Sequence, residues 1–222
     1  MRLGLLLALL LLVAACGGGG DEPTVDEIVE AAAQAAPTLE SFHFQLGVSN
    51  PASSPDREGL ALSAAEGDVV VPRRLRADFQ GTYRGLSVDS QIVLIGSRLF
   101  LELPGERWRE LGQTVNLVEL FRPGRGVPAV LRSATGLERL DAEEVDGTET
   151  HHLRGLVPGR ELGAFFPGAP PAGRRELEVW IGKEDSVVRR ASLTDPSSAA
   201  TYTIEISQLG EPVRIERPSV TP

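Results

Sequence analysis

The sequence contains one side chain whose surroundings prepare it for covalent chemistry, the thiol of Cys16. It is the only cysteine among 222 residues, and it closes the motif Val13-Ala14-Ala15-Cys16 at the end of an apolar run, residues 3–13. That run is far shorter than the roughly 20 residues that a membrane-spanning helix needs, so it predicts a signal peptide. Cys16 therefore stands where an export signal is cut.

Two cleavage reactions can be considered at this point. Ordinary signal peptidase accepts small residues such as Val13 and Ala15 before its cut, and it would release a secreted protein with a free thiol. The motif also resembles the bacterial lipobox, whose cysteine is diacylated, with chains such as palmitate, and becomes the first residue. An unpaired cysteine is a liability in an oxidising compartment, and two acyl chains anchor a protein stably. We therefore predict lipidation of Cys16 and attachment to the membrane through its acyl chains.

Three segments follow from this prediction. Residues 1–15 are the lipoprotein signal peptide, residues 16–23 form a lipidated glycine-rich tether, and residues 24–218 form one lipid-binding domain. A length of about 200 residues is ordinary for a single β-rich domain. The expected location is the extracytoplasmic face of the cell membrane, where the flexible tether holds the domain off the bilayer.

No other group of residues predicts catalysis or metal binding. His151 and His152 are neighbours in an expected strand and point to opposite faces, so they cannot easily share one ion. The acidic run 141–146 leads into a turn and is typical of a solvated edge. Residues 124–129 match G-x-G-x-x-A but follow no strand, and the sequence has no G-x-S-x-G or P-loop motif. The chain is predicted not to be an enzyme and to use no cofactor or metal.

The net charge of −9 limits the partners that the chain can bind. Nucleic-acid binding depends on neutralising phosphates, so an acidic chain without a basic run is not expected to bind nucleic acid. Anionic headgroups would repel the protein as well, so attachment to a membrane has to come from acyl chains. We expect a monomer.

The remaining pattern predicts one helix followed mainly by strands. Thr24 and Glu27 have the spacing of a capping box, and the helix that they begin is expected to end at Ala36, before Pro37. Apolar and polar residues then alternate, which is typical of strands with one buried face. The expected strands cover residues 42–48, 67–71, 74–79, 86–95, 98–103, 137–145, 148–157, 176–181, 187–193 and 200–209. Short helices are expected over residues 115–121, 127–131 and 159–166, with a polar tail from Arg214.

This order predicts an α+β fold with a strongly curved antiparallel half-barrel sheet that wraps around the N-terminal helix and the short helices. The apolar residues on its converging faces would either fill an ordinary core or leave an apolar cavity for a hydrophobic ligand. We select candidate lining residues by the periodic spacing and the apolar character of their side chains. They are Phe44, Leu46, Leu75, Phe79, Ile92, Leu94, Val118, Phe121 and Val130.

Several stretches resemble, in order along the chain, the LppX, LprA, LprF and LprG family of actinobacterial lipoproteins. They are Cys16, Ala65-Glu66-Gly67-Asp68-Val69-Val70-Val71-Pro72, Ile92-Val93-Leu94-Ile95-Gly96, Leu99-Phe100-Leu101, Trp108, Val145-Asp146-Gly147-Thr148, Gly155-Leu156-Val157-Pro158, Val179-Trp180-Ile181-Gly182 and Val187-Val188-Arg189-Arg190. The resemblance implies a half-barrel over helices, as in the LolA and LolB carriers, with a cavity for acyl chains. It offers no catalytic motif, and Gly182 departs from the acidic turn residue expected in relatives.

These features predict a membrane-anchored lipoprotein that binds acylated lipids or glycolipids in an apolar cavity and carries or presents them in the cell envelope. An envelope transporter is a possible partner. The alternative is a non-enzymatic cell-surface sensor or scaffold module with a fully packed core, and an enzyme assembled from distant residues ranks third. Lipid that co-purifies with the protein would distinguish the first two.

Overall fold

The structure, a computed structural model, describes residues 22–50, 60–83, 85–103, 107–111, 124–162, 172–196 and 199–220. Its α-helices are α1 (Val25–Ala35) and α3 (Gly126–Ser133), and its short 3-10 helices are η1 (Ala36–Thr38) and η2 (Gly159–Leu162). The strands are β1 (Ser41–Ser49), β2 (Leu60–Val70), β3 (Arg74–Tyr83), β4 (Leu86–Ile95), β5 (Arg98–Leu103), β6 (Arg107–Leu111), β7 (Thr135–Arg139), β8 (Glu143–Val145), β9 (Thr148–Pro158), β10 (Arg174–Gly182), β11 (Val188–Asp195) and β12 (Ala200–Ser207).

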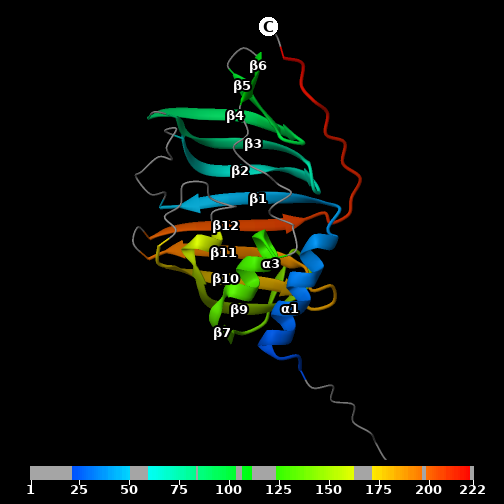
Figure 1. The fold of residues 1–222 in the computed structure, drawn as a ribbon, viewed down its shortest axis with the longest axis vertical. Helices are drawn as coiled ribbons and strands as arrows, with labels where there is room; N and C mark the ends of the chain where they lie inside the picture. Colours follow the sequence, from blue (N-terminus) through cyan, green and yellow to red (C-terminus); the bar gives the residue numbers. More distant parts are fainter. Residues whose placement is uncertain are drawn as a thin grey trace, which may run out of the picture.

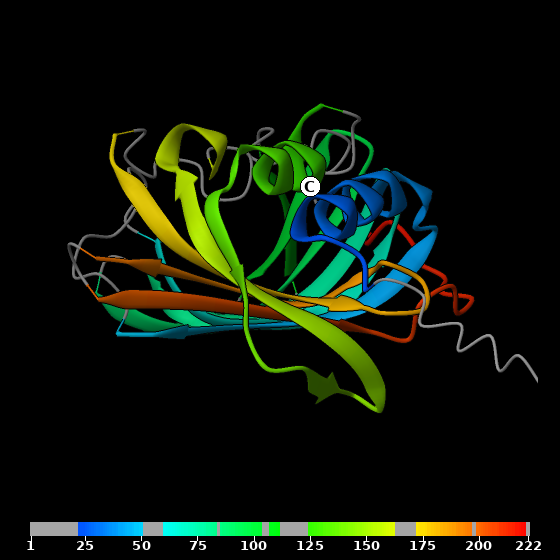
Figure 2. The same ribbon diagram turned by 90° about the horizontal axis from the view of Figure 1, so that it is seen from below.

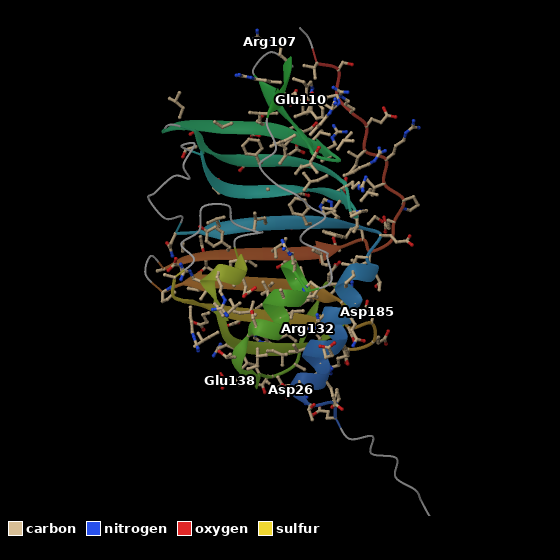
Figure 3. The ribbon with its side chains drawn as sticks, in the orientation of Figure 1. Asp26, Arg107, Glu110, Arg132, Glu138 and Asp185 are labelled. Atoms are coloured by element: carbon tan, nitrogen blue, oxygen red, sulfur yellow. The ribbon has the colours of Figure 1, made fainter. Side chains whose placement is uncertain are left out.

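All twelve strands belong to one antiparallel sheet, which confirms the predicted α+β class. The strand order is β6-β5-β4-β3-β2-β1-β12-β11-β10-β9-β7, and β8 pairs with β9 beside this path (Figure 1). The first and last strands of the chain, β1 and β12, pair at the middle of the sheet. Glu110 of β6 and Glu138 of β7 accordingly lie at opposite ends of the molecule (Figure 3).

The sheet is open and not strongly curled, so the predicted half-barrel that wraps around its helices is wrong in that respect. Its end strands β6 and β7 do not pair with each other. Both α-helices lie on one side of the sheet (Figure 2) and in front of its β9–β12 half (Figure 1). Each half of the sheet runs outward from the β1–β12 pair, so no strand pairing draws the two ends together.

Helix α1 begins where the sequence predicts. The side chain of Thr24 accepts a hydrogen bond from Glu27 N, and the Glu27 carboxylate accepts one from Thr24 N at 2.7 Å, so the capping box is complete. Ile28, Val29 and Ala32 form the buried face. Arg132 of α3 donates two hydrogen bonds of 2.9 Å to Glu30, which joins the two helices.

Among the residues that the structure describes, three apolar clusters stabilise the fold. The first lies beneath the helices and joins residues of α1 and α3 with residues of β9 and β10, such as Leu153 and Val179. The second lies over β1–β4 on the same side of the sheet and contains Phe42, Phe44 and Leu94. The third consists of Val93, Phe100 and Ile215, with Trp108 and others packed against it.

The third cluster corrects the predicted polar tail. Ile215 is only 2% exposed, and its carbonyl accepts a hydrogen bond of 2.6 Å from Arg74 Nη1. The segment after β12 therefore packs along the sheet instead of leaving it. The sequence signal for this packing is short, because only Val213 and Ile215 alternate with polar residues here, and two apolar residues are too few to establish a period.

Two further elements differ from the prediction. The single strand expected over residues 137–145 is two strands in the structure, β7 and β8. The regular pairing with β9 is interrupted between them, where Leu140 N donates a hydrogen bond of 2.9 Å to His152 O. The helix expected over residues 159–166 is the single turn η2, and its remainder lies outside the described residues. The helix expected over residues 115–121 also lies outside them.

Replacing Gly67 of β2 should destabilise the fold, because a Cβ at this position would lie 2.0 Å from the carbonyl oxygen of Arg76 on β3. We expect Gly67→Ala to cost about 2 kcal/mol or more in the free energy of unfolding, measured by urea denaturation. Gly47→Ala is the matched control, since Gly47 lies on the adjacent strand β1 and a Cβ there meets nothing within 4 Å. Equal stability of the two variants would contradict this close approach.

Candidate functional site

The candidate site is the inner face of the sheet, defined here as the face that carries α1 and α3. The antiparallel registers align inner residues of neighbouring strands into rows that cross the sheet. The two central rows are Ala191, Ile204, Leu46, Ala65 and Phe79, and then Ile206, Phe44, Gly67, Ala77 and Ile92. Every side chain in these rows is apolar, so the middle of the inner face is an apolar surface.

Six of the nine predicted lining residues lie together on this face, over β1–β4. Phe44 and Leu94 are buried members of the second cluster, against which Leu46, Leu75 and Ile92 pack. Phe79 is buried on the same face, where it pairs with Ala65 of β2. The period-2 pattern therefore placed these side chains on a common surface, and whether they contact a ligand stays a prediction.

The other three lining residues do not join this group. Val130 lies on α3 and packs in the first cluster, beneath the helices. Val118 and Phe121 lie outside the described residues, as does the predicted lipidation site Cys16.

The apolar surface is open to solvent at the centre of the sheet. Ile204 of β12 is 37% exposed, and its partners in the row, Leu46 and Ala191, are only half-buried. These residues lie between the first and second clusters, where the packing of each cluster ends. Exposed apolar side chains at the centre of a sheet lose the stabilisation that burial would give, which makes this strip a candidate for ligand contact.

Sequence reasoning missed several residues of this surface. Phe42, Val69 and Ala77 are buried in the second cluster, and Ile204 and Ile206 extend it onto β12. The alternation of Tyr202, Ile204 and Ile206 carried the necessary signal. What the sequence did not reveal is that β12 pairs with β1.

The opposite, outer face carries the third apolar cluster at β4 and β5, and over β12 and β1–β4 it has a polar hollow of about 550 Å³. Its lining includes the carboxylates of Glu66, Asp78, Asp89 and Glu205. This hollow differs from the predicted apolar cavity in both face and chemistry. We therefore assign the candidate site to the inner strip and not to this hollow.

His43 lies beside this hollow and bridges two carboxylates of β2. Its Nδ1 is 2.9 Å from Asp68 Oδ1, and its Nε2 is 3.2 Å from Glu66 Oε1. Burial by itself would lower the pKa of His43, but the hydrogen bonds with Asp68 and Glu66 outweigh it and raise that pKa above its ordinary value. In its protonated form the imidazole of His43 can donate to both carboxylates and so join β1 to β2.

The two adjacent histidines point to opposite faces, as predicted. His152 on the outer face stacks on Trp180, with ring centroids 4.2 Å apart, and its Nε2 is 3.0 Å from Glu178. On the inner side, burial and the nearby Arg139 and Lys183 charges lower the pKa of His151. Among the described residues, no group of three or more histidine, cysteine or acidic side chains is arranged to hold a metal ion. No helix in the described part of the chain is long and apolar enough to span a membrane.

The family model for the LppX_LprAFG lipoprotein matches residues 24–215. The chain belongs to this lipoprotein family. The lipoarabinomannan carrier protein LprG of Mycolicibacterium smegmatis is 22% identical over 199 residues, covering 86% of this chain and 82% of LprG. The putative phthiocerol dimycocerosate transporter LppX of Mycobacterium tuberculosis is 30% identical over 112 residues, which are 49% of this chain and 46% of LppX.

Solved structures of the family share the fold. LprF from Mycobacterium bovis matches with a TM-score of 0.72 at 16% identity, covering 89% of this chain and 98% of LprF. LppX from Mycobacterium tuberculosis matches with a TM-score of 0.65 at 24% identity, covering 88% of this chain and all of LppX. The predicted family is thus confirmed. The relatives LprG and LppX are named as a carrier and a putative transporter, and neither name is that of an enzyme.

Replacing His43 should destabilise the protein in acid more than in base. Because its pKa is raised in the folded state, the protonated His43 contributes stability that is complete below the unfolded pKa of about 6.5 and is lost as the pH rises through the folded pKa. We therefore expect His43→Gln to lower the free energy of unfolding more at about pH 5.5 than at about pH 9. Urea denaturation at both values measures the difference. An equal loss at both would show that the two carboxylates do not stabilise the imidazolium.

Proposed function

We propose that this lipoprotein binds acylated lipids or glycolipids on the inner face of its sheet and carries or presents them in the cell envelope. The observation that carries the proposal is the half-exposed apolar strip around Ile204, between two packed clusters. An acyl chain lying on this strip would remove apolar surface from water, at about 25 cal/mol for each Å² buried. A site formed in this way between the inner face and the helices would be the apolar cavity predicted from the sequence.

Two further observations support the proposal. The chain belongs to the LppX_LprAFG lipoprotein family, and its relatives LprG and LppX are named a lipoarabinomannan carrier protein and a putative phthiocerol dimycocerosate transporter. At the centre of the sheet the two inner rows are apolar, whereas the outer row beside them is polar and consists of Arg190, Glu205, Gln45, Glu66 and Asp78.

We further propose that the protein works beside the membrane that supplies its ligand. Cys16 would be acylated at its lipobox, and residues 16–23 would tether the domain to the extracytoplasmic face of the membrane. The tether is short, so the apolar strip would stay close to the bilayer surface. An envelope transporter would then be a natural partner for loading or unloading.

Introducing a charge into the apolar strip should abolish lipid binding without unfolding the protein. We expect Ile204→Asp to reduce co-purified lipid at least tenfold, because a carboxylate beside an acyl chain has no partner and costs several kcal/mol to desolvate. The full chain is expressed in a mycobacterial host, and its lipids are extracted and quantified by mass spectrometry. Leu156→Asp is the matched control, since Leu156 of β9 is an apolar residue of similar exposure, 41%, on the outer face of the sheet.

The outcome also separates the carrier from a packed sensor or scaffold module. Stoichiometric lipid in the wild type and the Leu156 variant, with loss in the Ile204 variant, supports carriage on the inner face. Wild-type protein that is repeatedly purified without bound lipid and takes up no lipid in vitro would contradict the proposal that the protein is a lipid carrier.

Replacing Cys16 should release the protein from the membrane. If the cysteine is acylated, Cys16→Ser removes the thioether and both acyl chains, so the mature protein loses its anchor. We expect wild-type protein in the membrane fraction, labelled by radioactive palmitate, and no label in the variant. A variant that stays membrane-bound and labelled would contradict lipidation at Cys16.

A further inference from the structure

One ion pair interrupts the apolar inner face near the end of β10 and β11. Arg175 of β10 has the same inner orientation as Leu177 and Val179, and its Nε lies 3.1 Å from Asp195 Oδ2 on β11. The two side chains are only 12% and 19% exposed. Their row therefore places two nearly buried charges where the rows beside it carry apolar residues.

The neighbours of the pair are apolar on both sides. Val157 of β9 pairs with Arg175 and is fully buried, while Ala200 of β12 pairs with Asp195 and is 1% exposed. A nearly buried ion pair stabilises a fold little, because the desolvation of two charges offsets their attraction, and apolar residues of similar volume are often as good. The contribution of this ion pair to the stability of the fold therefore does not by itself explain why two charged residues occupy these positions.

The guanidinium group is held in a fixed position. Besides Asp195, Arg175 contacts backbone oxygens through Nη1, at 3.3 Å from Arg174 O and 3.5 Å from Ala172 O. Gly173 has a positive φ of 84°, and a Cβ there would lie 3.2 Å from this Nη1, so the glycine leaves room for the guanidinium. Among the described residues, these bonds use Nε and Nη1, whereas a guanidinium carries five N–H donors.

The pair lies in line with the apolar strip. Asp195 is four residues along β11 from Ala191, which pairs with Ile204. At about 3.3 Å per residue, the pair is about 13 Å from the centre of the strip. A ligand whose acyl chain lies on Ile204 and extends along β11 and β12 would bring its polar end to Arg175 and Asp195.

We propose that Arg175 and Asp195 bind a hydroxyl-bearing head group, such as a sugar or polyol, of the acylated ligand; this inference rests on the proposed function. A hydroxyl both donates and accepts, so it can donate to the Asp195 carboxylate and accept from the Arg175 guanidinium. The pair has no net charge, so an anionic phosphate would gain attraction from Arg175 and meet repulsion from Asp195. A ligand without a polar group would bind poorly beside Arg175 and Asp195, because it would remove water from both charges without replacing its hydrogen bonds.

A competition experiment tests this head-group site. The full chain, purified in mild detergent, is incubated with equal amounts of the methyl ether of dioleoylglycerol, which has no hydroxyl, glucosyl-dioleoylglycerol and dioleoyl phosphatidic acid, and the bound lipids are quantified by mass spectrometry. Because the acyl chains are identical, only the head group differs. We expect the wild type to prefer the glucosyl lipid about tenfold over the other two, as one or two added hydrogen bonds would give.

Three variants make the expectation specific. The double variant Arg175→Met with Asp195→Leu should still bind the methyl ether of dioleoylglycerol and should lose the preference for the glucosyl lipid. Asp195→Asn, which conserves volume, leaves the guanidinium without its carboxylate and should shift the preference toward phosphatidic acid. The control replaces an ion pair of the outer face, Arg190→Met with Glu205→Leu, whose side chains are 2.7 Å apart, and should keep the wild-type preference.

The outcomes separate this inference from the proposed function. Wild-type protein that binds none of the three lipids contradicts the proposed function itself. Wild-type protein that binds all three equally or prefers phosphatidic acid, or a double variant that keeps the glucosyl preference, overturns the head-group site while leaving acyl-chain binding intact.

Discussion

The pairing of β1 with β12 is the contact on which the rest of the structure depends. It joins a half-sheet of β1–β6 to a half-sheet of β7–β12, and seven residue pairs hold the two together. Because the register pairs Leu46 with Ile204, the apolar strip crosses from one half to the other at this point. The helices lie over the β9–β12 half, and the second cluster lies over the other. The candidate site exists because the two halves meet between these clusters.

The two faces of the sheet divide the chemistry of the protein. The outer face holds its charges in cross-strand pairs, as at His43 with Asp68 and Arg190 with Glu205. Such pairs satisfy polar groups on a solvated face, and the carboxylates around the outer hollow suit it to water more than to lipid. The inner face has the opposite character, and its nearly buried ion pair, Arg175 with Asp195, stands out for that reason.

Local patterns in the sequence predicted local structure well. The spacing of Thr24 and Glu27 predicted the start of α1, and alternation placed six lining residues on one face. The sequence could not reveal which strands pair across the chain, because pairing between distant strands leaves no local period. The prediction of a half-barrel was wrong because it depended on such distant strand pairing. The prediction of a polar tail was wrong because Ile215 is buried. The rows of inner residues through Ile204 and Ile206 could be recognised only once the register between β1 and β12 was known.

The position of β12 also determines when the inner face is complete. The two residues at its centre, Leu46 and Ile204, lie about 160 residues apart along the chain, so their contact forms late and slowly compared with the hairpins on either side. The half-sheet of β1–β6 can assemble while the rest of the chain is still emerging, but its apolar strip then lacks the strand that continues it. The apolar strip of a nascent chain is therefore incomplete until the last strand has been added.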